Sequence, residues 1–242
     1  MDMGGTGDRR TEWFVPSFGP LKLRIFIGLL FLPYTGMVLA FTVIGSMMPE
    51  HIHWDRVCAI VVIYFLALGI GGHALDALGS KGPKPWGSVL SEKGLLIIAI
   101  TSIAGAYMIG IYYMVLYTPL LWLIAIPEGF LLLAYNLEWF HGRFHTDTWF
   151  GLSWGSLPVL AGYIIQTNQV SWAVLMVAAS MGLLSLVEIK ASRPYKKMKR
   201  ELAANGKTSE TDQIQWLESI LKSISMGIIL LGIGFLTWRL NG

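Results

Sequence analysis

Three of the five histidines in the sequence lie in two short polar stretches, each beside the end of an apolar run. In the first stretch, His73 and Asp76 are three residues apart, a spacing that places both side chains on one face of a helix. In the second, Glu138, His141 and His145 follow at i, i+3 and i+7, which is one face if the preceding helix continues. A carboxylate beside imidazoles can transfer protons near neutral pH or bind a divalent metal.

Simpler roles stand beside these. His73 and Asp76 can cap a helix end, and the histidines of the second stretch can belong to a polar loop. A di-iron centre would need two Glu-x-x-His units and two further glutamates. The chain has one such unit, from Glu138 to His141, so this centre has little support.

Other polar groups flank the two stretches. Tyr135 precedes Glu138 by three residues, and Arg143 and Asp147 follow it closely. Glu188 stands at the end of a later apolar run, shortly before Arg193. We expect these groups to share one membrane-boundary site with the two stretches, although Glu188 could also be a residue at lipid head-group level, offset by nearby lysines.

Glu128 is different because it lies within an apolar run. An isolated ionised carboxylate inside a membrane is costly, so we expect it to be protonated or paired within a helix bundle. A proton relay, a contact to a substrate hydroxyl and an interhelical hydrogen bond are all compatible with this position. His51 and His53 lie far from the other groups and are expected at the opposite membrane interface.

The composition identifies the elements that must position these residues. The 242 residues are 54% hydrophobic and only 14% charged, with a mean hydropathy of +0.58; soluble chains carry roughly 25% charged residues. The apolar residues form long blocks, each sufficient to cross the ~30 Å hydrocarbon core as a helix. The sequence therefore predicts an all-α, polytopic membrane bundle. The net charge of +3 gives no reason to expect a nucleic-acid partner, and the single cysteine excludes a disulfide framework.

Seven membrane spans are predicted: 23–48, 56–78, 94–117, 119–139, 150–166, 170–189 and 224–240. With this alternation every Lys and Arg except Arg56 and Arg239 falls on one side. The positive-inside rule makes that side the cytoplasm, with the N-terminus inside and the C-terminus outside. We expect a multi-pass protein of the cell (plasma) membrane.

We treat residues 1–242 as a single integral-membrane domain. Residues 1–20 form a polar cytoplasmic tail, and residues 190–223 form a basic cytoplasmic segment. Within this segment, the spacing of Ile214, Leu217 and Leu221 predicts an amphipathic surface helix over 209–221. The basic run 196–200 is expected to contact anionic lipid head groups.

The layout resembles the UbiA superfamily of intramembrane prenyltransferases, and the similarity extends over roughly residues 20 to 200. His73-Ala74-Leu75-Asp76 stands where that family carries its first Asp-rich motif, after the second span. The segment from Tyr135 to His145 corresponds to the Tyr- and Arg-bearing segment after the fourth span. The glycine- and proline-containing run 151–163 looks like the fifth span of the family, and Glu188 with Arg193 falls at the second acidic motif.

The resemblance implies an enzyme that acts on an isoprenoid lipid by prenyl transfer or related prenyl-diphosphate chemistry. Asp76, Glu138 and Glu188 would then hold a divalent metal, in first place Mg²⁺, with Fe or Zn admitted by the histidines. Lys81, Lys84, Arg143 and Arg193, together with Tyr135, would bind the substrate. His73, His141 and His145 would act as bases or metal ligands. The expected partners are membrane lipids and the isoprenoid or prenyl-diphosphate substrate; no protein partner is indicated.

Two other classes of function stay open. One is a non-catalytic lipid-binding or accessory membrane subunit that has kept the bundle without the chemistry. The other is a membrane oxidase or hydroxylase with iron bound by the three histidines His73, His141 and His145.

Overall fold

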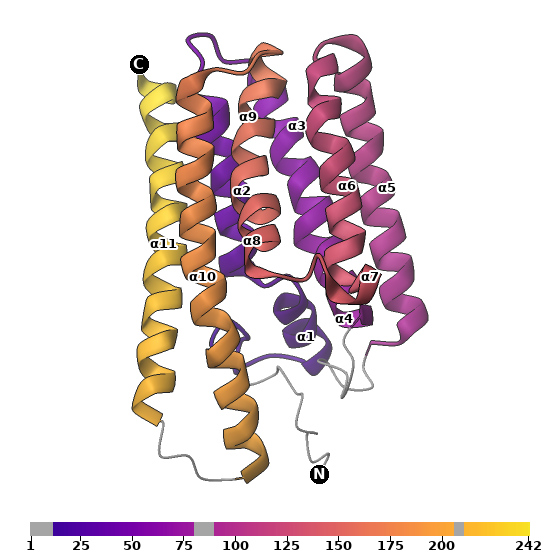
Figure 1. Cartoon of the computed structure of the whole chain (residues 1–242), viewed down its shortest axis with the longest axis vertical. Helices are drawn as coiled ribbons and strands as arrows, with labels where there is room; N and C mark the ends of the chain where they lie inside the picture. The colour runs from indigo at the N-terminus through magenta and orange to yellow at the C-terminus, as the bar shows by residue number, and fades with distance from the viewer. Residues whose placement is uncertain (1–11, 80–89, 206–210) are drawn as a thin grey trace.

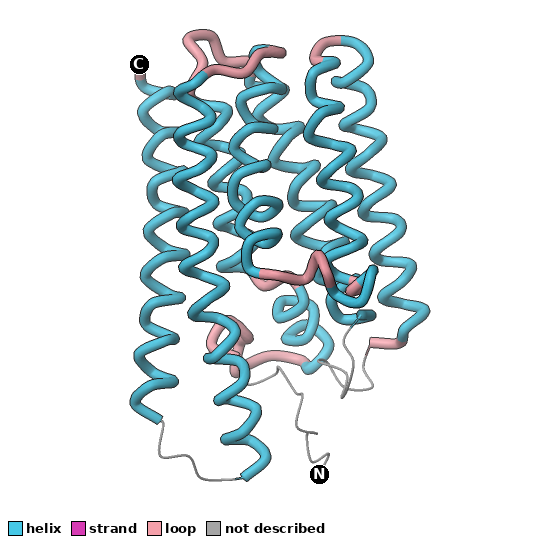
Figure 2. Tube along the Cα trace, in the orientation of Figure 1, coloured by secondary structure: helices cyan, strands magenta, loops and turns pink. Residues whose placement is uncertain are grey.

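The structure is a computed structural model that describes residues 12–79, 90–205 and 211–242. Within these ranges the regular elements are all helical, as Figures 1 and 2 show. The elements are α1 (Leu21–Leu29), α2 (Leu32–Met47), α3 (Trp54–Tyr64), η1 (Phe65–Gly72), α4 (His73–Gly79), α5 (Glu92–Leu116), η3 (Pro119–Leu121), α6 (Trp122–Asn136), α7 (Trp139–Gly142), α8 (Asp147–Phe150), η4 (Gly151–Ser156), α9 (Leu157–Thr167), α10 (Trp172–Asn205) and α11 (Thr211–Asn241).

Six helical rods in the described ranges are long and apolar enough to cross a membrane: Leu21–Met47, Trp54–Gly79, Glu92–Leu116, Pro119–Asn136, Trp172–Leu202 and Thr211–Asn241. Helices suit the membrane because they satisfy their backbone hydrogen bonds internally, and the lipid hydrocarbon offers the backbone no hydrogen-bonding partners. The prediction of an all-α, multi-pass membrane bundle is confirmed.

The fifth predicted span is the helical run 147–167, formed by α8, η4 and α9. It is not among the six apolar rods, because glycine, serine and glutamine interrupt its hydrophobic residues. The polar side chains of Ser153 and Gln166 are buried within the bundle rather than exposed to lipid. The run lies alongside α10 and α2 (Figure 1), and the prediction of seven crossings depends on it.

Close backbone contact fixes α9 against α2. Gly162 lies against the Thr42 carbonyl, and Gly45 lies against the Val159 carbonyl, so closely that a β-carbon at either glycine would collide with it. The Ser46 hydroxyl also donates to the Gly162 carbonyl at 3.1 Å. Small residues of this kind let membrane helices approach closely and gain van der Waals contact.

Three of the membrane-crossing segments carry breaks. The first rod is interrupted at Phe31, whose φ of 44° separates α1 from α2. The second rod contains the π-helical segment η1, and the helical run 147–167 contains the π-helical segment η4. Such segments widen a helix locally and often border functional sites.

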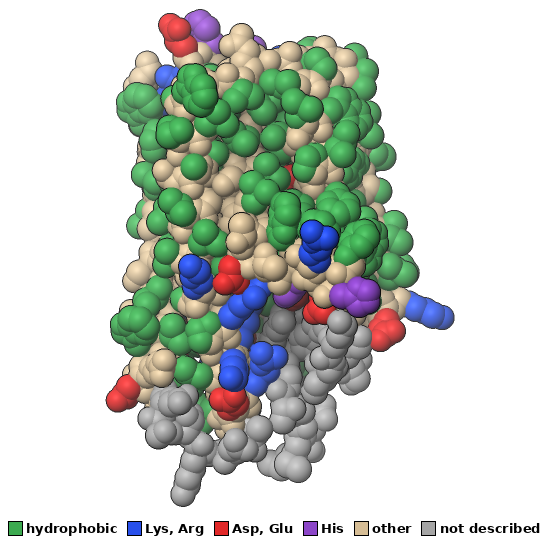
Figure 3. All heavy atoms as spheres, in the orientation of Figure 1, with side chains coloured by type: hydrophobic (Ala, Val, Ile, Leu, Met, Phe, Trp, Pro, Cys, Tyr) green, Lys and Arg blue, Asp and Glu red, His purple; other side chains and the backbone are tan. Residues whose placement is uncertain are grey.

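The predicted surface helix over 209–221 is not separate, because α11 runs without interruption from Thr211 to Asn241. Ile214, Leu217 and Leu221 are buried in the same hydrophobic core as residues of α10, which stabilises a long antiparallel pair. Figure 1 shows α10 and α11 extending beyond the other helices at the lower end. Basic side chains gather there over α10, while the upper part of this face is largely apolar (Figure 3).

The described part of the predicted N-terminal tail also packs on the bundle. Val15 is buried, and the Phe14 ring lies 4.8 Å from the Phe31 ring. The aromatic side chains before α1 therefore cover the break between α1 and α2.

Candidate functional site

A polar pocket opens at the lower end of the bundle, on the side from which α10 and α11 extend. Its cavity volume is about 180 Å³, room for several waters or a small head group. The chain segments that enclose it are far apart in sequence: the start of α2, α4, the end of α6, residues 145–154 and α10. Its lining residues are Phe31, Tyr34, His73, Asp76, Tyr135, Asn136, His145, Phe150, Trp154, Glu188, Ile189, Ser192, Arg193 and Lys196.

His73 is buried and held by aromatic rings. Its ring stacks on Phe31 at 4.5 Å and lies 5.3 Å from Trp154. Its Nε2 is 3.3 Å from the Thr35 hydroxyl oxygen, and that hydroxyl donates its one hydrogen to the Leu30 carbonyl at 2.6 Å. Because this hydroxyl hydrogen is already donated, the Thr35 oxygen is placed to accept a hydrogen bond from Nε2–H of His73.

His145 closes the end of α6. Its Nδ1 donates to the Tyr135 carbonyl at 3.0 Å, and its ring stacks on the Tyr135 ring at 4.4 Å. The last carbonyls of a helix have no partner within that helix, so His145 supplies one here. Arg193 then donates to the His145 carbonyl at 3.3 Å and forms an ion pair of 3.1 Å with Asp147.

One face of α10 supplies the charged wall. Glu188, Ser192, Arg193 and Lys196 line the pocket at helical spacing, and Glu188 is 5% exposed. The Lys196 ammonium lies over the Phe31 ring at 5.4 Å, within reach of a cation–π interaction. Lys196 was not among the predicted site residues, because the sixth span was expected to end at Ile189 and the basic run to contact lipid. The continuation of the α10 spacing from Glu188 would have revealed it.

The pocket brings together six of the predicted site residues: His73, Asp76, Tyr135, His145, Glu188 and Arg193. Three others, Glu138, His141 and Arg143, do not line it. Lys81 and Lys84 lie outside the described residues.

Glu138, His141 and His145 would share one face only if the fourth helix continued through His145, and it does not. α6 ends at Asn136, and Glu138, Phe140 and His141 adopt positive φ values of 51°, 54° and 59°. The chain reverses here, and the reversal lets His145 return to the end of α6. His141 is consequently exposed, and the three histidines of the two stretches do not converge.

The π-helical segments border the pocket from two sides. α4, which begins at His73, follows η1 directly, and Trp154 lies within η4. Gly72 lets η1 lie close to α6 and η4, since a β-carbon there would lie 3.3 Å from Leu132 and 3.5 Å from Trp154. The two irregular segments therefore position His73 against the ring of Trp154.

The donor set does not by itself form a metal centre. Asp76 and Glu188 share the pocket, but the predicted third carboxylate, Glu138, does not line it. Among the residues that the structure describes, no group of three or more His, Cys, Asp or Glu side chains is placed to hold a metal ion. The divalent metal stays a prediction, and no step below is routed through it.

Fold and site together define a polytopic helical membrane protein with a charged, aromatic-walled pocket at one end of the bundle. Comparison with known proteins identifies no relative: no family model, no curated protein and no solved structure matches the chain. The similarity to the UbiA superfamily rests on the quoted residues alone.

Proposed function

We propose that the pocket binds the anionic head group of an isoprenoid lipid and that the protein is an enzyme of the UbiA type acting on it. The carrying observation is the convergence of ionisable groups from α4, α6, the 145–154 segment and α10 on one cavity. Ionisable groups gathered at a membrane boundary inside a bundle are a usual mark of a substrate site.

In this proposal Arg193 and Lys196 bind the head group. A guanidinium offers a planar set of donors to phosphate oxygens, and an ammonium adds a compact charge. The Lys196 ammonium lies over the rings of Phe31 and Tyr34, at 5.4 and 6.0 Å from their centroids, so it is held at the aromatic wall of the pocket. The hydrocarbon chain of the lipid would leave the pocket toward the apolar helices.

His73 and His145 are the groups proposed to move protons. Each ring has one nitrogen fixed by a hydrogen bond to the protein, and each lines the same cavity as Asp76 and Glu188. Fixed imidazoles beside carboxylates suit general acid–base chemistry near neutral pH. An isoprenoid substrate follows from the sequence resemblance, whereas the anionic head group follows from the two cations.

Turnover of a labelled prenyl diphosphate by the purified protein, supplied with a lipid extract as acceptor source, tests the proposal. Asp76→Asn and Glu188→Gln should abolish turnover, while Glu50→Gln, at the opposite end of the bundle, should leave it unchanged. Full activity in both pocket variants would contradict the proposed chemistry.

Binding is measured separately from turnover. Lys196→Ala should weaken binding of the prenyl diphosphate by about ten-fold, the scale of a charge-assisted hydrogen bond. Lys190→Ala is the matched control, because Lys190 also lies on α10, is exposed and does not line the pocket. Binding that depends on Lys196 without any turnover would favour the second candidate, a lipid-binding subunit, which the lack of a three-donor group among the described residues also favours.

A further inference from the structure

A second cavity lies deeper in the bundle, and it is almost entirely apolar. It is enclosed by α3, η1, α5, η3, α6 and Ala161 of α9, and its volume is about 70 Å³. It shares no lining residue with the polar pocket. Glu128 is seven residues before Tyr135 on α6, so about 10 Å along the helix axis separates the two sites.

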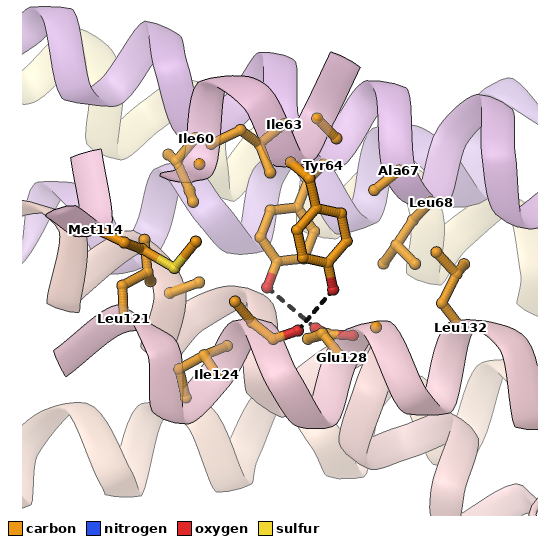
Figure 4. A pocket seen from close by; sticks show the side chains of 16 residues that line it. Ile60, Ile63, Tyr64, Ala67, Leu68, Met114, Leu121, Ile124, Glu128 and Leu132 are labelled. Carbon is orange, nitrogen blue, oxygen red and sulfur yellow. Dashed lines mark hydrogen bonds between the residues drawn. The ribbon is translucent and has the colours of Figure 1, made fainter. Parts of the chain in front are cut away.

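The Glu128 carboxylate is the polar feature that points into this cavity (Figure 4). The Tyr64 hydroxyl donates to its Oε1 at 3.0 Å. The other oxygen, Oε2, is buried and has no hydrogen-bond partner within the described part of the chain. Buried polar atoms are almost always partnered, so an unpartnered carboxylate oxygen indicates a missing group.

The second nearby tyrosine does not supply this partner. The Tyr107 hydroxyl donates to the Ala125 carbonyl at 2.9 Å instead. Gly129 makes this possible, since a β-carbon there would collide with the Tyr107 hydroxyl. Tyr107 is thereby fixed on α6 as a wall of the cavity, and Oε2 still lacks a partner.

The chemistry of the missing group follows from its surroundings. The remaining walls are aliphatic or small side chains, which disfavour an ionised ligand. A hydroxyl both donates and accepts, so it can satisfy Oε2 whether the carboxyl is ionised or protonated. Ile63, Ala67 and Ala125 are partly exposed, so the cavity is not sealed from the lipid-facing surface.

We infer that this cavity is a second binding site, which takes the hydroxyl end of an apolar, membrane-dissolved alcohol or phenol, with Glu128 as its hydrogen-bonding partner. The inference does not depend on the function proposed for the polar pocket. A water molecule is the competing occupant, and it would satisfy Oε2 without any organic ligand.

Photolabelling of the full-length protein in nanodiscs tests the site, with a diazirine-bearing alkylphenol as the probe. Labels should map by mass spectrometry to α3, α5 and α6 around Glu128. Thymol should compete about five-fold more strongly than p-cymene, which has the same carbon skeleton without the hydroxyl, since one hydrogen bond is worth about this factor.

Two variants test separately whether labelling depends on the Glu128 carboxylate and whether it depends on the volume of the cavity. Glu128→Leu removes the hydrogen-bonding group and should lower labelling about five-fold. Gly110→Leu fills the cavity, because a β-carbon at Gly110 meets only Met114 and Ile63, at 3.6 and 3.8 Å. Gly234→Leu is its control, since nothing lies within 4 Å of a β-carbon there.

Either of two results would overturn the inference: equal competition by p-cymene and thymol, or wild-type labelling in Glu128→Leu. Absence of cavity labels in the wild-type protein would also overturn it and leave water as the occupant. If Glu128→Leu fails to fold, the labelling of Gly110→Leu is compared with that of Gly234→Leu. Lower labelling in Gly110→Leu supports the site, and equal labelling in the two variants overturns it. None of these results bears on prenyl-diphosphate turnover, so the two proposals fail separately.

Discussion

Substitution of Gly162 by alanine should destabilise the bundle, although alanine is the better helix former. A β-carbon at this position would collide with the Thr42 carbonyl and lie 3.0 Å from the Ser46 amide nitrogen. Both obstacles are backbone atoms of α2, so α9 and α2 must move apart. The separation would also break the hydrogen bond from the Ser46 hydroxyl to the Gly162 carbonyl.

The size of the effect follows from these two losses. Overpacking in a close-packed interior costs about 1–3 kcal/mol, and loss of the hydrogen bond costs about 1 kcal/mol more. Gly227→Ala is the matched control, since nothing lies within 4 Å of a β-carbon at Gly227 in α11. Both substitutions gain the same helix propensity, up to about 1 kcal/mol. Their free energies of unfolding should therefore differ by about 2–4 kcal/mol.

Reversible unfolding in mixed detergent and SDS micelles, followed by tryptophan fluorescence, measures this difference. A difference below about 0.5 kcal/mol, the range of neutral surface substitutions, would refute the close approach of α9 to α2. The same contact bears on the polar pocket, because α9 continues from η4, which carries Trp154 against His73. Gly162→Ala should accordingly also weaken head-group binding, whereas Gly227→Ala should not.

Two further predictions concern the lower end of the bundle. His145→Ala should lower the free energy of unfolding by about 1–2 kcal/mol, since it loses a ring stack with Tyr135 and a hydrogen bond. His141→Ala, at an exposed position, should change this free energy by less than about 0.5 kcal/mol. Equal effects of the two substitutions in the same unfolding assay would contradict the chain reversal after α6. Lys197→Gln and Arg200→Gln should each weaken enrichment of fluorescent phosphatidylserine around the protein in nanodiscs by about 1 kcal/mol, and added salt should screen this effect. An enrichment that is insensitive to both substitutions would show that the α10 extension does not contact anionic lipid.

The fold was predictable because membrane insertion imposes a strong pattern on the sequence. Long apolar blocks indicate helices of known length, and the described helices lie within a few residues of most predicted spans. The breaks were not predictable in the same way. The positive φ at Phe31 and the widened turn before His73 are stabilised by tertiary contacts, which hydrophobicity does not record.

The site was predictable only in part, for a related reason. His73, Asp76 and Glu188 stand at the ends of apolar blocks, so their shared depth could be inferred from the distribution of basic residues. Placing His141 beside His145 required a helix that continues past Asn136. The structure favours the reversal instead, because His145 then supplies a donor to a carbonyl at the end of α6.

The length of α10 explains how a charged pocket can exist at the edge of an apolar bundle. Cations are costly within hydrocarbon, and long side chains near helix ends extend toward the interface to avoid that cost. Because α10 continues past its apolar part, Arg193 and Lys196 stand one and two turns beyond Glu188 on the same helix. Arg193 and Lys196 can then approach the pocket from the aqueous interface, while the buried Glu188 carboxylate remains at the inner end of the pocket. An anionic head group that enters from the interface would meet the cations first, and its apolar chain would remain in the bilayer. This arrangement requires that a shortening of α10 after Glu188 abolishes binding of the prenyl diphosphate without unfolding the bundle.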